Sequence, residues 1–360
     1  MNYRFQIAEG DDGLRRDQLE AMMSIEESYV VPRLPCSSIT KYGRVPLESW
    51  RRKICQWAFR VIDHFRLDRE VVTIGMNLFD RFLLYHEQTD RQREAFQVAD
   101  CRCPCCKRSS DPTTYQLAAM TSIYISAKLA SLQNNPDENA PQTHFRLSTF
   151  ADLSRGQFTM NDIYITERTI YQTVGWKVML PSPVTFVSHL LVLMPKCDDS
   201  VVTAALKHDL VLHVLHEISR YLTEIATCLG SSCSQHRPSH VAFAAILVSM
   251  DLLTYEALPH SIRETFRCRV DQVCGIRSVD SLVRRLERAL WPEMLLDHSH
   301  DLPADVGHPI AVARNHGILD LHRIYYSRDT NNSMLSALEK TESTELFTHH
   351  PETSPVSTAR

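Results

Sequence analysis

The spacing of apolar residues constrains this chain more than any other feature of its sequence. From residue 50 to about residue 290, apolar residues recur at three- and four-residue steps in one segment after another. The segment that begins at Trp50 continues with Ile54, Trp57, Ala58, Val61, Ile62 and Phe65. This spacing places the apolar side chains on one face of an α-helix. The chain also has only ten glycines, fewer than turn-rich β folds usually contain. The sequence therefore predicts an all-α protein.

The expected helices form two groups of five. The first fills residues 50–176 and the second residues 183–290, and Pro181-Ser182-Pro183 separates them. A short helix over residues 17–29 precedes both groups. From these patterns we expect a leader with that helix (1–49), a first domain (50–180) with a Cys-rich loop or insertion (86–113), a second domain (181–292) and a disordered tail containing Ser, Thr and Pro (293–360).

Composition and motifs exclude several classes of protein. Lys and Arg number 39 against 43 Asp and Glu, which is no basic surplus for holding nucleic acid. The chain has no P-loop, no GxGxxG and no run of 18 apolar residues. Because its first ten residues are polar, we do not expect them to be a signal peptide. Eleven cysteines without a signal peptide indicate reduced thiols. We expect a soluble intracellular protein without cofactor, nucleic-acid partner or membrane contact.

Five segments carry a resemblance to a known family. They are Trp50–Trp57 (WRRKICQW), Met76–Leu83 (MNLFDRFL), Leu117–Lys128, Thr166–Trp176 and Pro181–Phe186. In this order and at this spacing they resemble the cyclin box and its exit into a second box. The match covers residues 50–190 well and 190–290 weakly. Residues 19–29 look like the helix that precedes the box in D-type cyclins, although the Leu-x-Cys-x-Glu motif of that type is absent.

The resemblance implies two tandem five-helix cyclin boxes. It also implies a non-catalytic regulatory subunit that binds and activates a cyclin-dependent protein kinase in cell-cycle control, in the nucleus and cytoplasm. Protein substrates or inhibitors would be further partners. The alternatives are a cyclin-fold transcription factor and a cyclin-fold scaffold without kinase activation.

Lys128 and Glu167 match the charged pair through which cyclins contact the regulatory helix of the kinase, and the resemblance adds Leu117 to the kinase-binding residues. Glu167 lies on the same helical seam as Ile163 and Ile170, where an apolar residue is expected. A charge kept on such a seam suggests a partner inside the protein or outside it. The alternative is an exposed surface charge.

Arg51 and Asp80 match an ion pair that, in the family, ties the first helix of the box to the second. Asp80 stands in an otherwise apolar helix, and a buried carboxylate is costly unless it is paired. The alternative is that Asp80 faces solvent.

The resemblance also implies a substrate-docking patch on the first helix. Its matching residues are Trp50, Ile54, Trp57 and Gln116. Lys53 stands where the family has an apolar residue, and Arg60 where an acidic residue often lies. We therefore expect weakened or altered substrate recruitment. Trp57 by itself we expect in the core rather than in the patch.

Four thiols crowd one short segment, at Cys101, Cys103, Cys105 and Cys106. Zinc binding would need two well-separated Cys-x-x-Cys pairs, and only Cys103 to Cys106 forms one. We expect no metal here, with zinc and redox sensing as the alternatives to a segment without a role. Catalysis is not expected either, because the helix that carries His208, His213 and His216 lacks an HExxH arrangement and no nucleophile signature appears.

Overall fold

The structure is a computed structural model, and it describes residues 12–28, 47–96, 112–133, 146–195, 202–229, 236–296 and 309–320. In this part of the chain the regular elements are helices. Two residues in this part, Leu253 and Leu319, form an isolated β-bridge. The predicted all-α class is confirmed. None of these helices has both the length and the apolar content needed to span a bilayer.

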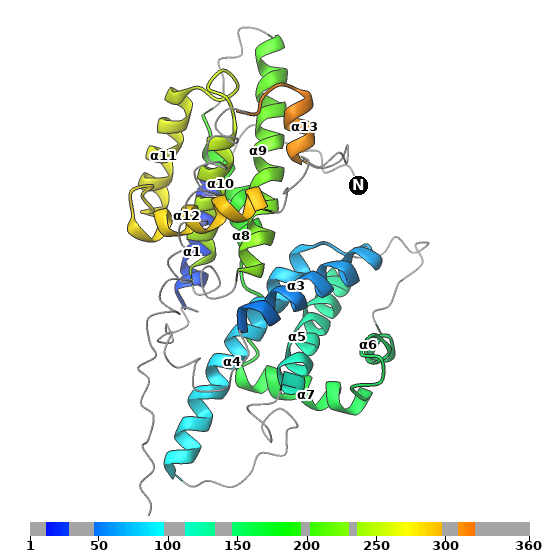
Figure 1. Cartoon of the computed structure of the whole chain (residues 1–360). Helices are drawn as coiled ribbons and strands as arrows, with labels where there is room; N and C mark the ends of the chain where they lie inside the picture. The colour runs from blue at the N-terminus through cyan, green and yellow to red at the C-terminus, as the bar shows by residue number, and fades with distance from the viewer. Residues whose placement is uncertain are drawn as a thin grey trace, which may run out of the picture.

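The first group of helices surrounds a central helix, α5 (Figure 1). The group consists of α3 (Leu47–His64), α4 (Glu70–Phe96), α5 (Pro112–Gln133), α6 (Leu147–Leu153) and α7 (Met160–Thr173). Helix α5 is apolar on nearly all sides and packs against α3, α4 and α7. Gly75 of α4 permits a very close approach, because a Cβ there would lie 2.6 Å from Ile123 Cδ1. These helices enclose one apolar core, which we call the first core.

The second group repeats this plan around α10. It consists of α8 (Pro183–Leu190), a 3-10 turn (Leu191–Leu193), α9 (Val202–Cys228), α10 (Pro238–Leu252), α11 (His260–Cys274) and α12 (Ser281–Leu296). Helix α10 is buried along most of its length and packs against α8, α9 and α12. Pro183 occupies the first turn of α8, and Gly275 ends α11 at φ 65°. The group encloses the second core.

The N-terminal helix, α1 (Asp12–Ser28), packs against the second group rather than the first. Leu19 enters the second core, and the Glu26 carboxylate accepts hydrogen bonds from the backbone N–H and the hydroxyl of Ser239, each at 2.7 Å. Ser239 lies at the start of α10, where backbone N–H groups have no partner within the helix. Glu26 thus caps a helix distant in sequence, and this ties α1 to the second group.

Two expected irregular regions contain helices. Helix α4 continues to Phe96, so the interval 86–113 begins as helix, and its residues 97–111 lie outside the described residues. In the expected tail, α12 extends to Leu296 and residues Pro309–Asn315 form α13. Helix α13 packs against α9 because Ala313 and the following Leu319 bury their side chains in the second core. The prediction of disorder over 293–360 is therefore wrong for residues 293–296 and 309–320, and residues 297–308 and 321–360 lie outside the described residues.

Candidate functional site

Lys128 and Glu167 meet at the edge of the first core. Lys128 lies near the end of α5 and Glu167 in the middle of α7, with Lys128 Nζ 3.1 Å from Glu167 Oε1. The side chain of Glu167 is 10% exposed and that of Lys128 is 44% exposed. The ammonium therefore covers the carboxylate and itself reaches solvent. The sequence left open whether Glu167 has a partner inside the protein, a partner outside it, or is an exposed charge. The structure shows that Glu167 has an internal partner, Lys128.

The surroundings of this pair keep its charge in place. The Lys128 ammonium also lies 5.8 Å from the centre of the Tyr124 ring. Burial lowers the pKa of Lys128, but the hydrogen bond and the charge of Glu167 outweigh it, so the net pKa is raised. An ammonium has three N–H donors, and Glu167 occupies one of them. The pair can thus offer further donors to a group outside the chain.

Exposed apolar side chains lie on the same helix as Glu167 and just after it. Met160 is 52% exposed, Tyr164 57%, Trp176 69% and Met179 42%, which is half of the eight strongly exposed large apolar side chains among the described residues. Clustered exposure of this kind marks an interaction surface more often than isolated exposure does. The sequence reading missed this surface.

The geometry of α7 explains how the surface forms. Met160, Tyr164, Glu167 and Tyr171 recur at helical steps and lie on one stripe of α7. The neighbouring stripe, with Ile163 and Ile170, is buried. The Tyr171 and Trp176 rings stack with their centres 5.0 Å apart, and Trp176 has a φ of 62°, a left-handed conformation that is rare for a bulky residue. A second apolar stripe beside the buried one was the signal in the sequence. We call Lys128, Glu167, Tyr164, Tyr171 and Trp176 the α7 surface.

Leu117 does not belong to this surface. It is 4% exposed, lies in the first core and stands 11 residues before Lys128 on α5, which corresponds to roughly 16 Å along the helix axis. The structure therefore places Leu117 in the core, and its assignment to kinase binding stays an untested prediction.

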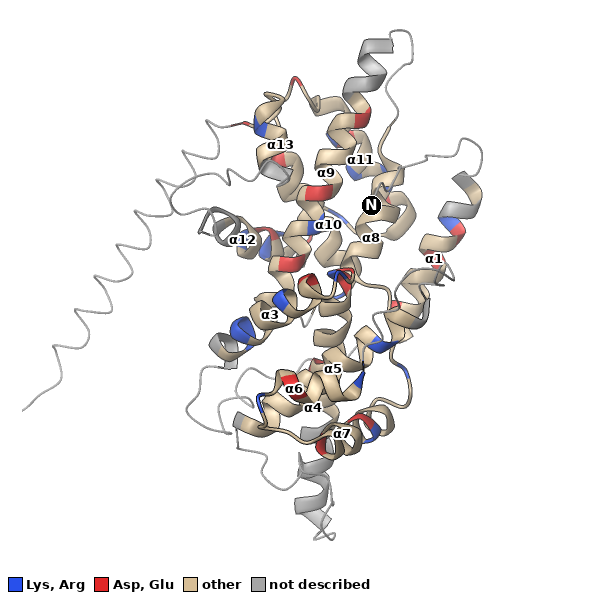
Figure 2. Cartoon of the chain, turned by 90° about the vertical axis from the view of Figure 1, so that its right-hand side faces the viewer, with Lys and Arg blue, Asp and Glu red and all other residues tan. Residues whose placement is uncertain are grey.

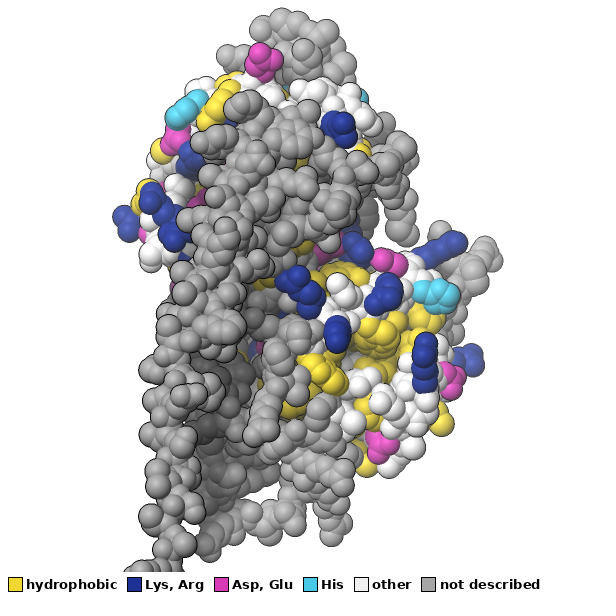
Figure 3. Space-filling view, viewed as in Figure 1, with side chains coloured by type: hydrophobic (Ala, Val, Ile, Leu, Met, Phe, Trp, Pro, Cys, Tyr) yellow, Lys and Arg dark blue, Asp and Glu magenta, His cyan; other side chains and the backbone are white. Residues whose placement is uncertain are grey.

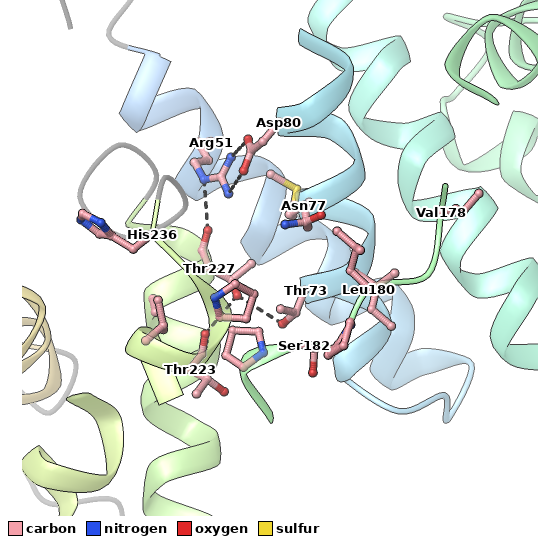
Figure 4. Close-up of a pocket in the computed structure, with 17 residues that line it drawn as sticks. Arg51, Thr73, Asn77, Asp80, Val178, Leu180, Ser182, Thr223, Thr227 and His236 are labelled. Carbon is pink, nitrogen blue, oxygen red and sulfur yellow. Dashed lines mark hydrogen bonds and ion pairs between the residues drawn. The ribbon is translucent and has the colours of Figure 1, made fainter. Parts of the chain in front are cut away.

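Arg51 and Asp80 lie together at the junction of the two groups (Figure 4). The guanidinium holds both carboxylate oxygens of Asp80, with Nη1 bonded to Oδ1 and Nη2 2.9 Å from Oδ2. Its Nε donates to the backbone carbonyl of Thr227 at 3.1 Å. Burial lowers the pKa of Arg51, and the charge of Asp80 more than offsets this. One side chain of α3 thus binds α4 and the end of α9.

Further polar contacts join the two groups at this junction. Arg69 forms an ion pair with Glu224, the Thr73 and Thr227 hydroxyls lie 3.2 Å apart, and Thr185 donates to Glu70 at 2.7 Å. A cavity at this junction, lined by residues that include Arg51, Thr73 and Thr227, measures about 50 Å³. This volume is far below the roughly 300 Å³ or more of a small-molecule site, so the junction is a structural contact.

The four residues of the expected substrate-docking patch lie on α3 and α5 and are half-buried. Ile54 and Trp57 pack against the first core, and the Trp57 ring meets Phe150 edge-on at 6.2 Å. Gln116 donates to the side chain of Gln157 at 3.0 Å. Trp57 is thus partly a core residue.

The basic character of this patch is also visible in the structure. Lys53 and Arg60 are exposed on α3. Lys and Arg recur along this helix (Figure 2), and in Figure 3 the apolar area of the first group lies among Lys and Arg side chains.

Metal ligands do not gather in the described part of the chain, where no group of three or more His, Cys, Asp and Glu side chains could hold an ion. The cysteines of the segment 101–106 lie outside the described residues. Zinc binding there stays an untested alternative.

The first group of helices matches a known protein family. Residues 22–179, from α1 to just past α7, match the family described as "Cyclin, N-terminal domain". The chain is 23% identical over 205 residues to G2/mitotic-specific cyclin-3 of Saccharomyces cerevisiae, covering 57% of this chain and 37% of the relative. It is 24% identical to G2/mitotic-specific cyclin-B2 of Oryzias javanicus over 225 residues, covering 62% and 46%. The chain thus spans less than half the length of these curated relatives.

A solved structure is similar over most of the chain but only weakly. A chain of the "Structure of the CAK complex form Chaetomium thermophilum bound to ATP-gamma-S" matches with a TM-score of 0.43 and 14% identity, covering 95% of this chain and 92% of the other, too low a score to carry an argument. The curated relatives above are mitotic cyclins, so the D-type similarity of residues 19–29 gains no support from them. Residues 22–179 of this chain are thus similar to the N-terminal domain of cyclins, and the chain is distantly similar to G2/mitotic-specific cyclins.

Proposed function

We propose that this chain is a regulatory subunit that binds and activates a cyclin-dependent protein kinase, without catalytic activity of its own, in the nucleus and cytoplasm. The observation that carries the proposal is the α7 surface, where a charged pair stands beside exposed aromatic rings. Such a mixture of rigid aromatic and charged side chains is typical of the centres of protein interfaces.

The mechanism we propose is positional. An active kinase needs the Glu of its regulatory helix paired with its catalytic Lys. A rigid helical surface that binds this helix only in its inward position shifts a pre-existing equilibrium toward the active state. Lys128 supplies spare N–H donors for carbonyl or carboxylate groups of the kinase, and Tyr164 and Trp176 supply apolar area.

The test is a pull-down with purified full-length chain and a panel of cyclin-dependent kinases, followed by a kinase assay. Lys128→Ala with Glu167→Ala should weaken kinase binding by about 2–5 kcal/mol, because it removes a charged contact at an interface. Arg60→Ala, an exposed charge on α3 away from this surface, is the matched control and should bind as the wild type does.

A charge swap separates an external role of the pair from an internal one. Lys128→Glu with Glu167→Lys preserves an ion pair within the chain but reverses what a partner meets. We expect this variant to fold and to fail in kinase activation. Full kinase activation by the swapped protein, or by the folded double-alanine variant, would refute the assignment of Lys128 and Glu167 to kinase binding. Kinase binding without activation would instead favour the scaffold alternative.

The same panel addresses the subtype and the substrates. Selective binding of the kinases that serve D-type cyclins would support the similarity of residues 19–29, and selective binding of mitotic kinases would follow the curated relatives. We also propose that the patch around Trp57 recruits basic substrate motifs weakly, because the exposed Lys53 and Arg60 repel them. Lys53→Ala with Arg60→Glu should then improve phosphorylation of a substrate with a basic motif.

A further inference from the structure

Two thiols from opposite groups of helices meet beside the Arg51 contact. Cys55, on α3, is fully buried in the first core, and its Sγ lies 3.6 Å from the carbonyl oxygen of Thr227. Cys228, the next residue and the last of α9, also packs against the first core although its helix belongs to the second group. Thr227 directly precedes Cys228 in the chain, so this contact brings Cys55 beside Cys228. The contact joins parts of the chain that are distant in sequence.

The two thiols differ in exposure and in acidity. Cys228 is partly exposed, whereas Cys55 is enclosed. The neighbouring Cys55 thiol lowers the pKa of Cys228 most, burial acts in the opposite direction, and the charges of Arg51 and Arg52 lower it further. The neighbouring Cys228 thiol and burial raise the pKa of Cys55. Cys228 is therefore the more acidic and the more exposed of the two thiols, with a second thiol beside it, which is the arrangement of oxidation-sensitive cysteines.

We propose that Cys228 and Cys55 form a peroxide-reactive pair that closes into a disulfide between the two groups of helices. The Cys228 thiolate attacks one oxygen of hydrogen peroxide, the O–O bond breaks, and the departing hydroxide takes up a proton to become water. Cys228 is then a sulfenic acid. The Cys55 sulfur attacks the sulfenic sulfur, the S–O bond breaks, and hydroxide leaves with the Cys55 proton as a second water. Two thiols lose two electrons in total, and one peroxide is reduced to two waters.

The position of the bond defines its effect. It would tie α3 to the end of α9 next to the hydrogen bond between Arg51 and Thr227, where the two groups already touch. Oxidation would therefore hold the two groups in their present arrangement and would leave the side chains of the α7 surface, on α5, on α7 and just after α7, chemically unmodified.

The test is mass spectrometry of the full chain. The reduced protein is treated with hydrogen peroxide, remaining thiols are alkylated, and the protein is cleaved with trypsin without reduction. Cys55 lies alone in the peptide 54–60, and Cys228 lies in 221–263 together with Cys233. A Cys233→Ser background leaves the second peptide with a single cysteine. We expect the two peptides to be cross-linked, the link to vanish with reductant and in Cys228→Ala, and Cys268→Ala to leave it unchanged.

The variant that decides the outcome is Cys228→Ala. Cys55→Ala is not used, because it leaves a hole in the core that endangers folding. A melting temperature that rises on oxidation of the wild type but not of Cys228→Ala would support the bridge. The proposal is overturned if the peptide 54–60 stays unlinked while dimedone traps a sulfenic acid on Cys228. It is equally overturned if Cys228 remains alkylatable at peroxide doses that oxidise the exposed Cys268.

Discussion

Removing the Arg51 guanidinium should cost this protein much more stability than removing any exposed charge of α3. Arg51 is 8% exposed, and it binds both oxygens of Asp80 and the carbonyl of Thr227. Breaking a buried ion pair by removing one partner costs about 3–5 kcal/mol, because the other charge is left uncompensated. Asp80 is 21% exposed, so water offsets part of this penalty. We therefore expect Arg51→Ala to lower the free energy of unfolding by about 3 kcal/mol.

Urea unfolding followed by circular dichroism measures this loss. Lys53→Ala is the matched control, because Lys53 is exposed on the same helix, and its effect should stay within about 0.5 kcal/mol. Arg51→Lys keeps the charge but not the two-pronged geometry, and should fall between the wild type and Arg51→Ala. The double variant Arg51→Ala with Asp80→Ala should cost less than the sum of its single variants by about 1–2 kcal/mol.

The reasoning fails if Arg51→Ala unfolds at the same urea concentration as Lys53→Ala. It also fails if the two single losses simply add, because additivity would mean that Arg51 and Asp80 do not interact in solution.

Three further outcomes follow from the structure. Gly75→Ala should lower the free energy of unfolding by about 1–3 kcal/mol in urea titrations, because its Cβ would collide with Ile123 on α5, and equal stability would contradict this close approach. Glu26→Ala should cost about 1–3 kcal/mol and expose α1 to limited proteolysis, because it removes the acceptor for Ser239 at the start of α10. Unchanged protection would show that the other contacts of α1, such as Leu19 in the second core, are enough to hold it. Burial raises the pKa of the Glu224 carboxyl from 4.5 to about 7, although the charges of Arg69 and Arg220 lower it. Between these pH values the folded state therefore binds more protons than the unfolded state. The free energy of unfolding should fall as the pH rises from 4.5 to 7. Glu224→Gln should flatten that slope in unfolding titrations at several pH values, and an unchanged slope would exclude Glu224 as its source.

The helices were predictable because their signal is local. A stripe of apolar residues at 3.6-residue spacing specifies a helix and its buried face without any knowledge of the partner, so the segments of both groups appear in the structure close to where they were expected. The same local logic singled out Glu167, a charge on a seam otherwise occupied by residues such as Ile163. The family resemblance, rather than periodicity, supplied Arg51 as the partner expected for Asp80.

Only the tertiary structure decided which helix faces pack against each other. The pattern of α1 shows an apolar side, but only the fold reveals that this side packs on the second group and that Glu26 caps α10. The short helix α13 has only seven residues, too few for a repeating apolar stripe to be recognised, and it is held by burial of Ala313 in the second core. Cys55 and Cys228 look unrelated in the sequence and lie beside each other at the junction. Periodicity describes one helix at a time, whereas these contacts depend on the packing of helices far apart along the chain.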